Sequence, residues 1–349
     1  MRGNGGRGSG HPLISIVMPV YNAQHHLESA LDSALNQDIR SLQLICVDDG
    51  STDDSQDILN RAAARDDRIT IVSQPNSGVS AARNNGIEHA AGDFICFMDS
   101  DDLYASRSSL RSLYEEAILD HQLVAGGSFA NYRGKGKIED EFADPVYSGY
   151  TLRNAGVIRY SDYQFDFGFH RFIFSKELFD RGAHRFPRLD YYEDPVFLAA
   201  ILHDASSFGT VSEPTYLYRC DFKPIHWTTE KTMDLLEGVK RNLVFSRERG
   251  YAKLHWYTAR HLDEASWYCG VGLEAQLDID AIDRKLQETE TELDHGLLAS
   301  VEPEDASFVP LLRKRIQAAR ISSPMRRSLA SAEFKLKKTL APLAHRLKS

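Results

Sequence analysis

The sequence has few of the features that mark secreted or membrane-spanning proteins. It contains four cysteines, none in a CxxC or Cys/His spacing that would indicate a zinc site. No apolar run approaches the roughly 20 residues that a transmembrane helix needs. The opening residues, MRGNGGRGSGHP, lack the apolar stretch of a secretion signal, and we expect a flexible tail over residues 1–11. These absences predict a cytoplasmic protein with reduced thiols.

Charge is distributed unevenly along the 349 residues. The net charge is −9, but residues 313–349 contain eleven Lys/Arg and one acid, so this part carries +10 and the rest −19. Basic residues flank a helical stripe of apolar side chains in the tail: Leu329, Ala332, Leu336, Leu340, Leu343 and Leu347. Such a helix favours peripheral contact with an anionic membrane surface, although Pro342 would kink it. The alternative is packing onto the acidic body or a partner subunit, and no nucleic-acid partner is expected.

The first third of the chain alternates strands with helices. Short apolar runs predict strands at residues 14–20, 42–47, 69–73 and 94–98. Apolar residues at helical spacing predict helices near residues 24–37, 54–65, 79–92 and 106–121. Repeated β-α units of this size predict a mostly parallel sheet with right-handed crossovers.

The rest of the chain is less regular. We expect a hairpin around Gly134-Lys135-Gly136, a helix near 195–203, and a pair of strands at 207–211 and 215–219. Aromatic residues alternate between Tyr160 and Phe174, which is typical of a half-buried strand or a core-covering loop. A sugar-stacking platform for an acceptor is the alternative for this stretch. From about residue 229 the pattern is helical, with an acidic helix near 278–295.

Two acidic clusters follow directly on apolar strands. They are DDGSTD at residues 48–53 and DSDD at residues 99–102. Carboxylates at the carboxyl ends of parallel strands fall in the crevice where open α/β sheets bind ligands. Asp99 and Asp101 can reach a common point, and carboxylate oxygens suit Mg²⁺ or Mn²⁺ that bridges to phosphates. The second cluster therefore predicts a metal that holds a phosphorylated substrate, with a solvated acidic loop as the alternative.

The first cluster lies beside a helix start. Ser51 or Thr52 can cap that helix, which leaves Asp48 and Asp49 to bind a nucleobase or ribose. Helix capping by these two acids is the alternative.

A third segment, residues 74–84, combines a glycine with the start of a Ser/Ala-rich helix. Gly78 permits close backbone approach, and the free N–H groups of the helix start suit phosphate. Arg83 can reach a diphosphate or a base, or it can pair with an acid.

Together these segments resemble family 2 glycosyltransferases of the GT-A fold. The matching stretches are IVMPVYN (16–22), VDDGSTD (47–53), NSGVSAARN (76–84) and FMDSDD (97–102). Four motifs in this order, spaced as β-α units, are specific as a set. The resemblance implies an α/β GT-A domain over residues 12–230, with a Rossmann-like, mostly parallel sheet flanked by helices. Residues 12–105 would bind the nucleotide-sugar and 106–230 the acceptor, followed by a helical C-terminal region at 231–321 and the basic tail at 322–349.

The resemblance also implies roles for single residues. Donor-binding residues would be Pro19, Val20, Tyr21, Asp48, Asp49, Asn76, Gly78, Arg83, Asp99 and Ser100. Asp101 would hold Mn²⁺ or Mg²⁺, and His226 is a second candidate ligand, with a purely structural role as its alternative. In the pair Glu193-Asp194, Asp194 would be the base that deprotonates the acceptor hydroxyl. Capping of the helix that follows, which has Pro195 in its first turn, is the alternative for this pair.

The expected activity is inverting transfer of a sugar from a nucleoside diphosphate sugar, with UDP as the expected carrier. The expected acceptor is a hydroxyl of a cell-surface glycan or a lipid-linked saccharide, met by a cytoplasmic enzyme at the inner face of the membrane. The alternatives are transfer to a polyprenyl phosphate and a non-catalytic nucleotide-sugar-binding module. A dinucleotide oxidoreductase is disfavoured because no GxGxxG motif follows the first strand.

Overall fold

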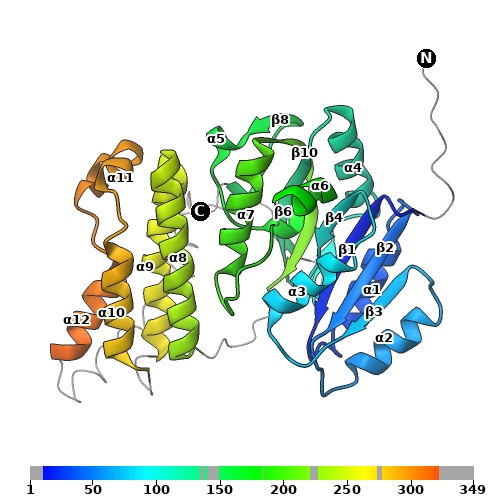
Figure 1. Ribbon diagram of the computed structural model, residues 1–349, viewed down its shortest axis with the longest axis horizontal. Helices are drawn as coiled ribbons and strands as arrows, with labels where there is room; N and C mark the ends of the chain where they lie inside the picture. The colour runs from blue at the N-terminus through cyan, green and yellow to red at the C-terminus, as the bar shows by residue number, and fades with distance from the viewer. Residues whose placement is uncertain are drawn as a thin grey trace. The chain divides into compact units, whose positions relative to one another are not determined.

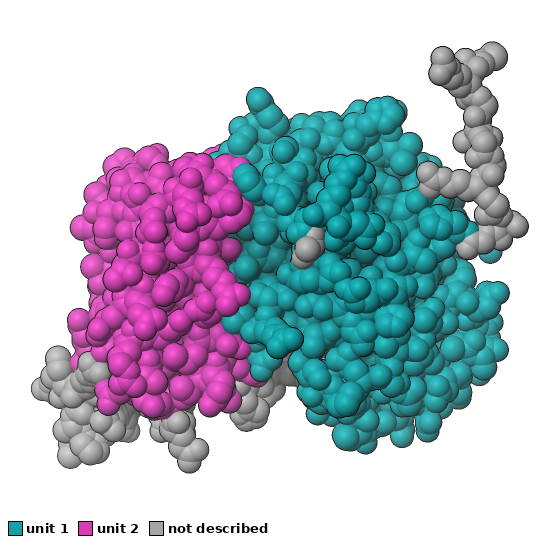
Figure 2. Space-filling model, in the orientation of Figure 1, with its two compact units in different colours: residues 1–222 teal, residues 223–349 magenta. Residues whose placement is uncertain are grey.

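The computed structural model describes residues 11–133, 137–139, 149–182, 184–220, 227–272 and 277–321. The chain divides into two compact units, residues 1–222 and 223–349 (Figure 2). Strands and helices alternate in the first unit, and the described part of the second unit is helical (Figure 1).

The first unit begins with regular β-α units. Its strands and helices up to residue 119 are β1 (Ile14–Val20), α1 (Leu27–Leu35), β2 (Leu42–Asp48), α2 (Ser55–Ala63), β3 (Ile69–Ser73), α3 (Val79–Glu88), β4 (Phe94–Phe97), β5 (Leu103–Tyr104) and α4 (Ser109–Leu119). The elements that follow are β6 (Val124–Arg133), β7 (Lys137–Glu139), β8 (Gly156–Arg159), α5 (Tyr160–Tyr163), the 3₁₀ helix η2 (Phe169–Arg171), β9 (Phe172–Ser175), α6 (Lys176–Gly182), α7 (Glu193–Ala205) and β10 (Ser207–Arg219).

Ten strands of this unit form one sheet within the described residues. Along its main path the strand order is β3-β2-β1-β4-β9-β6-β10-β5, while β7 pairs with β6 and β8 with β10. The pairs β3–β2, β2–β1, β1–β4 and β6–β10 are parallel, and β9 and β5 join antiparallel. The mostly parallel sheet that the sequence predicts is therefore confirmed, as is the hairpin of β6 with β7.

Helices cover both faces of the sheet (Figure 1). On one face, alternate residues of β1 such as Ile16 and Met18 share a core cluster with apolar residues of α1, α2 and α4. On the other face, α3 lies so close to β1 that a Cβ on Gly86 would sit 2.3 Å from Cγ1 of Val17. The same face carries an aromatic cluster centred on Phe97, whose ring contacts those of Phe169, Phe174, Phe179, Phe186 and Phe197.

The prediction of two separate strands at 207–211 and 215–219 is wrong. Both segments belong to one strand, β10. Its pairing with β6 shifts register on both sides of Pro214. Proline has no N–H to donate, so it is tolerated where the ladder is interrupted by a bulge. Pro214 thus marks an irregularity within a strand and not a turn between two strands.

The expected capping of α2 by Ser51 or Thr52 is also wrong. Asp54 is the N-cap residue, without a side-chain capping bond, and Asp53 Oδ1 instead accepts from the Ser55 N–H at 3.0 Å. Ser51 Oγ accepts from the Asn22 N–H, so it ties the loop after β2 to the loop after β1. The Asp53 contact thus lies at the start of α2, whereas the Ser51 contact joins two loops at the carboxyl edge of the sheet.

The second unit contains helices α8 (Thr229–Arg249), α9 (Ala252–Gly272), α10 (Ile279–Glu290), α11 (His295–Val301) and α12 (Leu311–Ile321), with the 3₁₀ helix η3 at Pro303–Ser307. The acidic helix expected near 278–295 corresponds to α10 and the turn after it. Within the parts of the chain that the structure describes, no helix combines the length and apolar character needed to cross a membrane. The amphipathic tail at 322–349 lies outside the described residues.

A buried histidine joins three helices of this unit. His255 Nε2 accepts from the Asp294 N–H at 2.8 Å, and its Nδ1 lies 2.8 Å from Ser246 Oγ. The Ser246 hydroxyl donates to the Leu243 carbonyl, so the histidine Nδ1–H is the donor in its contact with Ser246. Burial lowers the pKa of His255 to about 4, because the charged imidazolium would lose its hydration there.

We predict that the second unit loses stability as the pH falls from about 6.5, the unfolded value of histidine, towards 4. The folded pKa lies below the unfolded one, so the neutral ring stabilises the fold above pH 6.5 and progressively less below it. The loss should be at most about 1.4 kcal/mol per pH unit. Urea unfolding followed by tryptophan fluorescence measures this unit, because all three tryptophans lie in it.

His255→Gln should flatten this pH dependence, whereas His25→Gln, at an exposed position, should leave it unchanged. Equal slopes in the wild type and His255→Gln would contradict the assignment.

Candidate functional site

Both acidic clusters lie at one edge of the sheet, as the sequence predicts. The Asp49 N–H donates to the Val20 carbonyl at 2.9 Å, and the Met98 N–H donates to the Val17 carbonyl at 3.0 Å. The carboxyl ends of β2 and β4 therefore flank the end of β1. Tyr21, the next residue along from β1, has half of its surface exposed at this edge.

The buried carboxylate of Asp49 organises the loop after β3. Its Oδ1 accepts from the Ser77 N–H at 2.8 Å, and its Oδ2 accepts from the Gly78 N–H at 2.9 Å. Gln74 Nε2 also donates to Oδ1 at 2.7 Å. Two N–H groups that the sequence offers to a phosphate are thus used by Asp49. Its neighbour Asp48 accepts from the Ser51 N–H at 3.0 Å.

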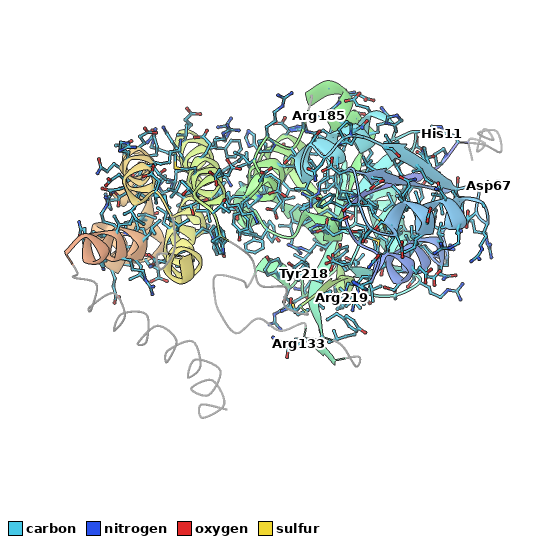
Figure 3. All side chains as sticks on the ribbon, turned by 90° about the horizontal axis from the view of Figure 1, so that it is seen from below. His11, Asp67, Arg133, Arg185, Tyr218 and Arg219 are labelled. Atoms are coloured by element: carbon cyan, nitrogen blue, oxygen red, sulfur yellow. The ribbon has the colours of Figure 1, made fainter. Side chains whose placement is uncertain are left out.

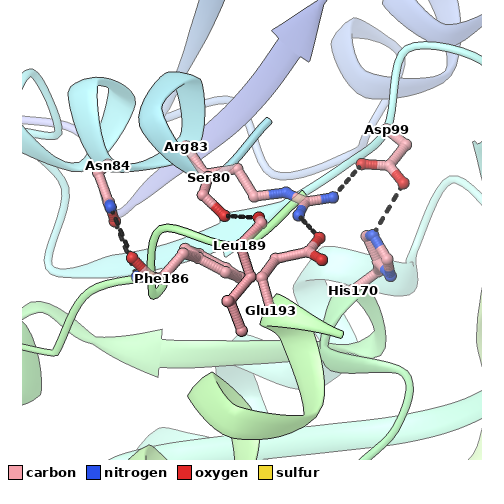
Figure 4. A network of polar contacts seen from close by, with 8 residues as sticks. All are labelled: Ser80, Arg83, Asn84, Asp99, His170, Phe186, Leu189 and Glu193. Carbon is pink, nitrogen blue, oxygen red and sulfur yellow. Dashed lines mark hydrogen bonds and ion pairs between the residues drawn. The ribbon is translucent and has the colours of Figure 1, made fainter. Parts of the chain in front are cut away.

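Arg83 of α3 joins the end of β4 to the start of α7 (Figure 4). Its Nη2 donates to Asp99 Oδ1 at 3.0 Å and its Nη1 to Glu193 Oε1 at 2.6 Å. The guanidinium carbon lies 4.8 Å from the ring centre of Phe169 and 5.1 Å from that of Phe186. Arg83 is only 4% exposed, so two carboxylates and two aromatic faces replace its water. The alternative in which Arg83 pairs with acids is the one seen here.

The charges of this group support one another. Burial alone would lower the pKa of Arg83, but Asp99 and Glu193 raise it above its usual value, so the guanidinium stays charged. Burial alone would raise the pKa of Asp99, yet His170 and Arg83 together lower it below its usual value. The site therefore contains an ionised carboxylate at the end of β4.

The sequence analysis missed two residues that hold this end of β4. His170 Nε2 lies 3.1 Å from Asp99 Oδ2, and its ring stacks on Tyr216 at 5.0 Å between centroids. Tyr216 Oη accepts from the Asp99 N–H at 3.0 Å and donates to Asp102 Oδ2 at 2.8 Å. Burial raises the pKa of Asp102, and the neighbouring Asp99 and Asp101 raise it further.

The sequence did contain a signal for His170. Aromatic residues alternate from Phe165 to Phe174, and His170 and Arg171 together break this alternation. Nothing in the sequence linked Tyr216 to the acidic cluster, since 117 residues separate it from Asp99. The aromatic run itself covers the core: Phe165, Phe169, Phe172 and Phe174 are buried. These four residues therefore offer no surface for sugar stacking.

The pair Glu193-Asp194 begins α7. Tyr192 precedes it as the N-cap residue, with φ +69° and no side-chain capping bond. Glu193 is bonded to Arg83, so this acid does more than cap the helix. Burial raises the pKa of Asp194 well above the usual carboxyl value, and the negative charges of Glu193 and Asp166 add to the effect.

Asp101, like Asp99, is half-buried. Its carbonyl accepts from Arg219 Nε at 2.7 Å. Arg219 follows Tyr218 at the end of β10 (Figure 3), and Tyr218 is exposed there. The two oxygens of Asp99 contact Arg83 and His170.

The described residues contain no group of three or more His, Cys, Asp or Glu side chains placed to hold a metal ion. Mg²⁺ is commonly held by one or two carboxylates together with substrate phosphates. The hard oxygens of Asp101 fit that mode. His226, the second candidate ligand, lies outside the described residues.

Comparison with known proteins identifies the class. Staphylococcus aureus TarS 1–349 in complex with UDP-GlcNAc has a TM-score of 0.64 at 18% identity, over 94% of this chain and 92% of that one. The fold is that of the GT-A glycosyltransferases.

Sequence comparison then gives the family. Residues 15–180 match the family described as "Glycosyl transferase family 2". The uncharacterized glycosyltransferase EpsJ of Bacillus subtilis is 30% identical over 213 residues, which cover 60% of this chain and 61% of EpsJ. Chondroitin synthase of Pasteurella multocida is 35% identical over 113 residues, which cover 32% of this chain and 12% of that protein. Residues 15–180 thus match glycosyl transferase family 2, and the chain spans less than two thirds of the length of these relatives.

We predict that Arg83→Met destabilises the protein by about 3–5 kcal/mol, because it leaves Asp99 and Glu193 without their shared positive partner. The change in the free energy of unfolding, from urea titration, measures this cost.

Arg61→Met is the matched control. Arg61 Nη2 lies 3.6 Å from Glu28 Oε1, with both side chains more than half exposed. Such surface pairs contribute at most about 1 kcal/mol. Equal losses in the two variants would show that Arg83 is not a structural link.

Proposed function

We propose that this chain transfers a sugar from a nucleoside diphosphate sugar, with uridine as the nucleoside, to a hydroxyl of a cell-surface glycan or a lipid-linked saccharide. The match of residues 15–180 to glycosyl transferase family 2 supports sugar transfer. The observation that carries the proposal is the contact chain from Asp99 through Arg83 to Glu193. It joins the acidic end of a parallel strand, where such folds bind ligands, to the acidic start of α7.

Asp194 is the proposed general base. Its carboxylate accepts the proton of the acceptor hydroxyl while the hydroxyl oxygen attacks the anomeric carbon of the donor sugar. The bond from that carbon to the diphosphate oxygen breaks, the nucleoside diphosphate leaves with the electron pair, and the configuration inverts. The raised pKa of Asp194 supports this role, because a carboxylate whose pKa lies nearer neutrality is a stronger base.

The donor is assigned to the carboxyl edge of the sheet. The exposed ring of Tyr21 and the loop at Ser100 border the proposed nucleotide position. Asp101 would hold Mn²⁺ or Mg²⁺, which as a Lewis acid neutralises charge on the departing diphosphate. The UDP-GlcNAc bound to TarS supports a uridine donor, and the name of chondroitin synthase supports a saccharide acceptor.

A screen of nucleotide-sugars for diphosphate release, with and without Mn²⁺, tests the proposal. Each donor is offered with a saccharide acceptor and, separately, with a polyprenyl phosphate. Metal-dependent release in the presence of a saccharide is the expected result. Diphosphate release only with the polyprenyl phosphate would show that the acceptor is a polyprenyl phosphate and not a saccharide. Donor binding without any turnover would indicate a binding module.

We predict that Asp194→Asn lowers kcat by about 10²–10⁴-fold and leaves donor affinity near the wild-type value, because only proton transfer is lost. In the wild type, transfer should fall as the pH drops through the raised pKa of Asp194, since protonation removes the base.

Asp120→Asn is the control, because Asp120 is an exposed acid at the end of α4. Transfer at the wild-type rate by Asp194→Asn would exclude Asp194 as the base.

We also propose that the tail, residues 322–349, brings the enzyme to an anionic membrane. It contains seven Lys/Arg and one acid. Each basic residue near such a surface contributes about 1 kcal/mol, and salt screens the attraction. We predict that the full chain floats with vesicles containing phosphatidylserine at low salt and that the chain ending at residue 321 does not.

Neutral phosphatidylcholine vesicles are the control, and transfer to a soluble acceptor should survive the truncation. Equal flotation of the two chains would refute the role of the tail.

A further inference from the structure

One face of α3 holds the segment that precedes the proposed base. Ser80 and Asn84, one helical turn apart, contact residues 186–193, which we call the linker segment (Figure 4). Ser80 Oγ donates to the Leu189 carbonyl at 2.9 Å. Asn84 Nδ2 donates to the Phe186 carbonyl at 2.9 Å, and Asn84 Oδ1 accepts from the Phe186 N–H at 2.9 Å. The asparagine thus satisfies both main-chain groups of one residue, more than 100 positions away in sequence.

The linker segment ends in a strained conformation. Tyr192 has φ +69° and ψ 20°, a left-handed conformation that a bulky residue rarely adopts. Such strain costs about 1–3 kcal/mol and persists where the surroundings hold the chain in place. Tyr192 is buried, with its ring 5.9 Å from that of Phe167, and Asp194 lies two residues further on.

The N-terminal end of α3, where Ser80 lies, also belongs to the donor side of the site. The helix follows Gly78, whose N–H donates to Asp49, and a Cβ on Gly78 would lie 3.0 Å from Oδ1 of Asp190 in the linker segment. One rigid helix therefore contacts both the loop after β3 and the segment that leads to α7.

We propose that Asn84 is a positioning residue that, together with Ser80, holds the linker segment and so sets the place of the Asp194 carboxylate relative to the donor. The inference rests on the proposed role of Asp194 as base. Asn84 acts through the main chain of Phe186 and touches no reacting group. Displacement of a catalytic group by about 1 Å can cost on the order of 10²-fold in rate, so a looser linker segment should lower turnover.

The chemistry of the amide makes the site selective. Asparagine offers one donor and one acceptor to Phe186, whereas an aspartate carboxylate offers acceptors alone. Asn84→Asp would keep the bond from the Phe186 N–H and place an oxygen against the Phe186 carbonyl. We therefore expect Asn84→Asp, although nearly isosteric, to be as harmful as Asn84→Ala.

The experiment compares the wild type with Asn84→Ala, Asn84→Asp and Ser80→Ala. Asn60→Ala is the matched control, because Asn60 is an exposed helical asparagine on α2. Hydrogen exchange at the Phe186 amide reports the bond to Asn84 directly, and steady-state kinetics report kcat and the donor KM. We expect about a 10–100-fold loss of kcat in both Asn84 variants, a donor KM within about 2-fold of the wild type, and faster exchange at Phe186. Ser80→Ala should change kcat in the same direction and by less, and it remains available should the Asn84 variants fail to fold.

Two results would overturn the inference while leaving the proposed function intact. Faster exchange at Phe186 with unchanged kcat would show that the linker segment does not determine the position of the Asp194 carboxylate. A loss confined to donor KM would assign Asn84 to donor binding instead. If the wild-type chain transfers no sugar from any donor, the proposed function is overturned, and the inference with it. This outcome is distinguishable because the control Asn60→Ala is then equally inactive.

Discussion

The charged side chain of Arg83 is almost completely buried. Its burial is possible because Asp99 and Glu193 accept its hydrogen bonds. The three residues come from α3, the end of β4 and the start of α7. A buried charge that loses its partners is strongly unfavourable, so these elements are held at one distance from each other. That constraint links the acidic edge of the sheet to the start of α7, where Asp194 follows Glu193, and the proposed chemistry depends on it.

The contacts around this ion group restrict it further. His170 takes the second oxygen of Asp99, and Tyr216 links the Asp99 main chain to Asp102. As a result Asp99 is part of the framework of the site, while Asp101 is the acid of this cluster that we propose to hold the metal. The aromatic rings around Phe97 exclude water from this region, and a drier environment strengthens each charged contact.

The sequence predicted what depends on local pattern. The strands β1 to β4 could be found because buried parallel strands are short, apolar runs, and the edge they share followed from their order. The sequence did not predict β10 as one strand, because Pro214 breaks the local pattern but only interrupts the pairing. Nor could it show that Asp49 is bonded to Ser77 and Gly78, since that contact joins residues more than 25 positions apart. Identities of candidate residues were readable from motifs, whereas their partners were set by tertiary packing.

The most direct test of the central claim is a crystal structure of the chain with a UDP-sugar and Mn²⁺. The account predicts that the diphosphate lies beside Asp101, that the sugar faces Asp194, and that Arg83 keeps its bonds to both Asp99 and Glu193. A structure in which Arg83 leaves Glu193 to bind the diphosphate, or in which the nucleotide lies away from this edge of the sheet, would contradict it.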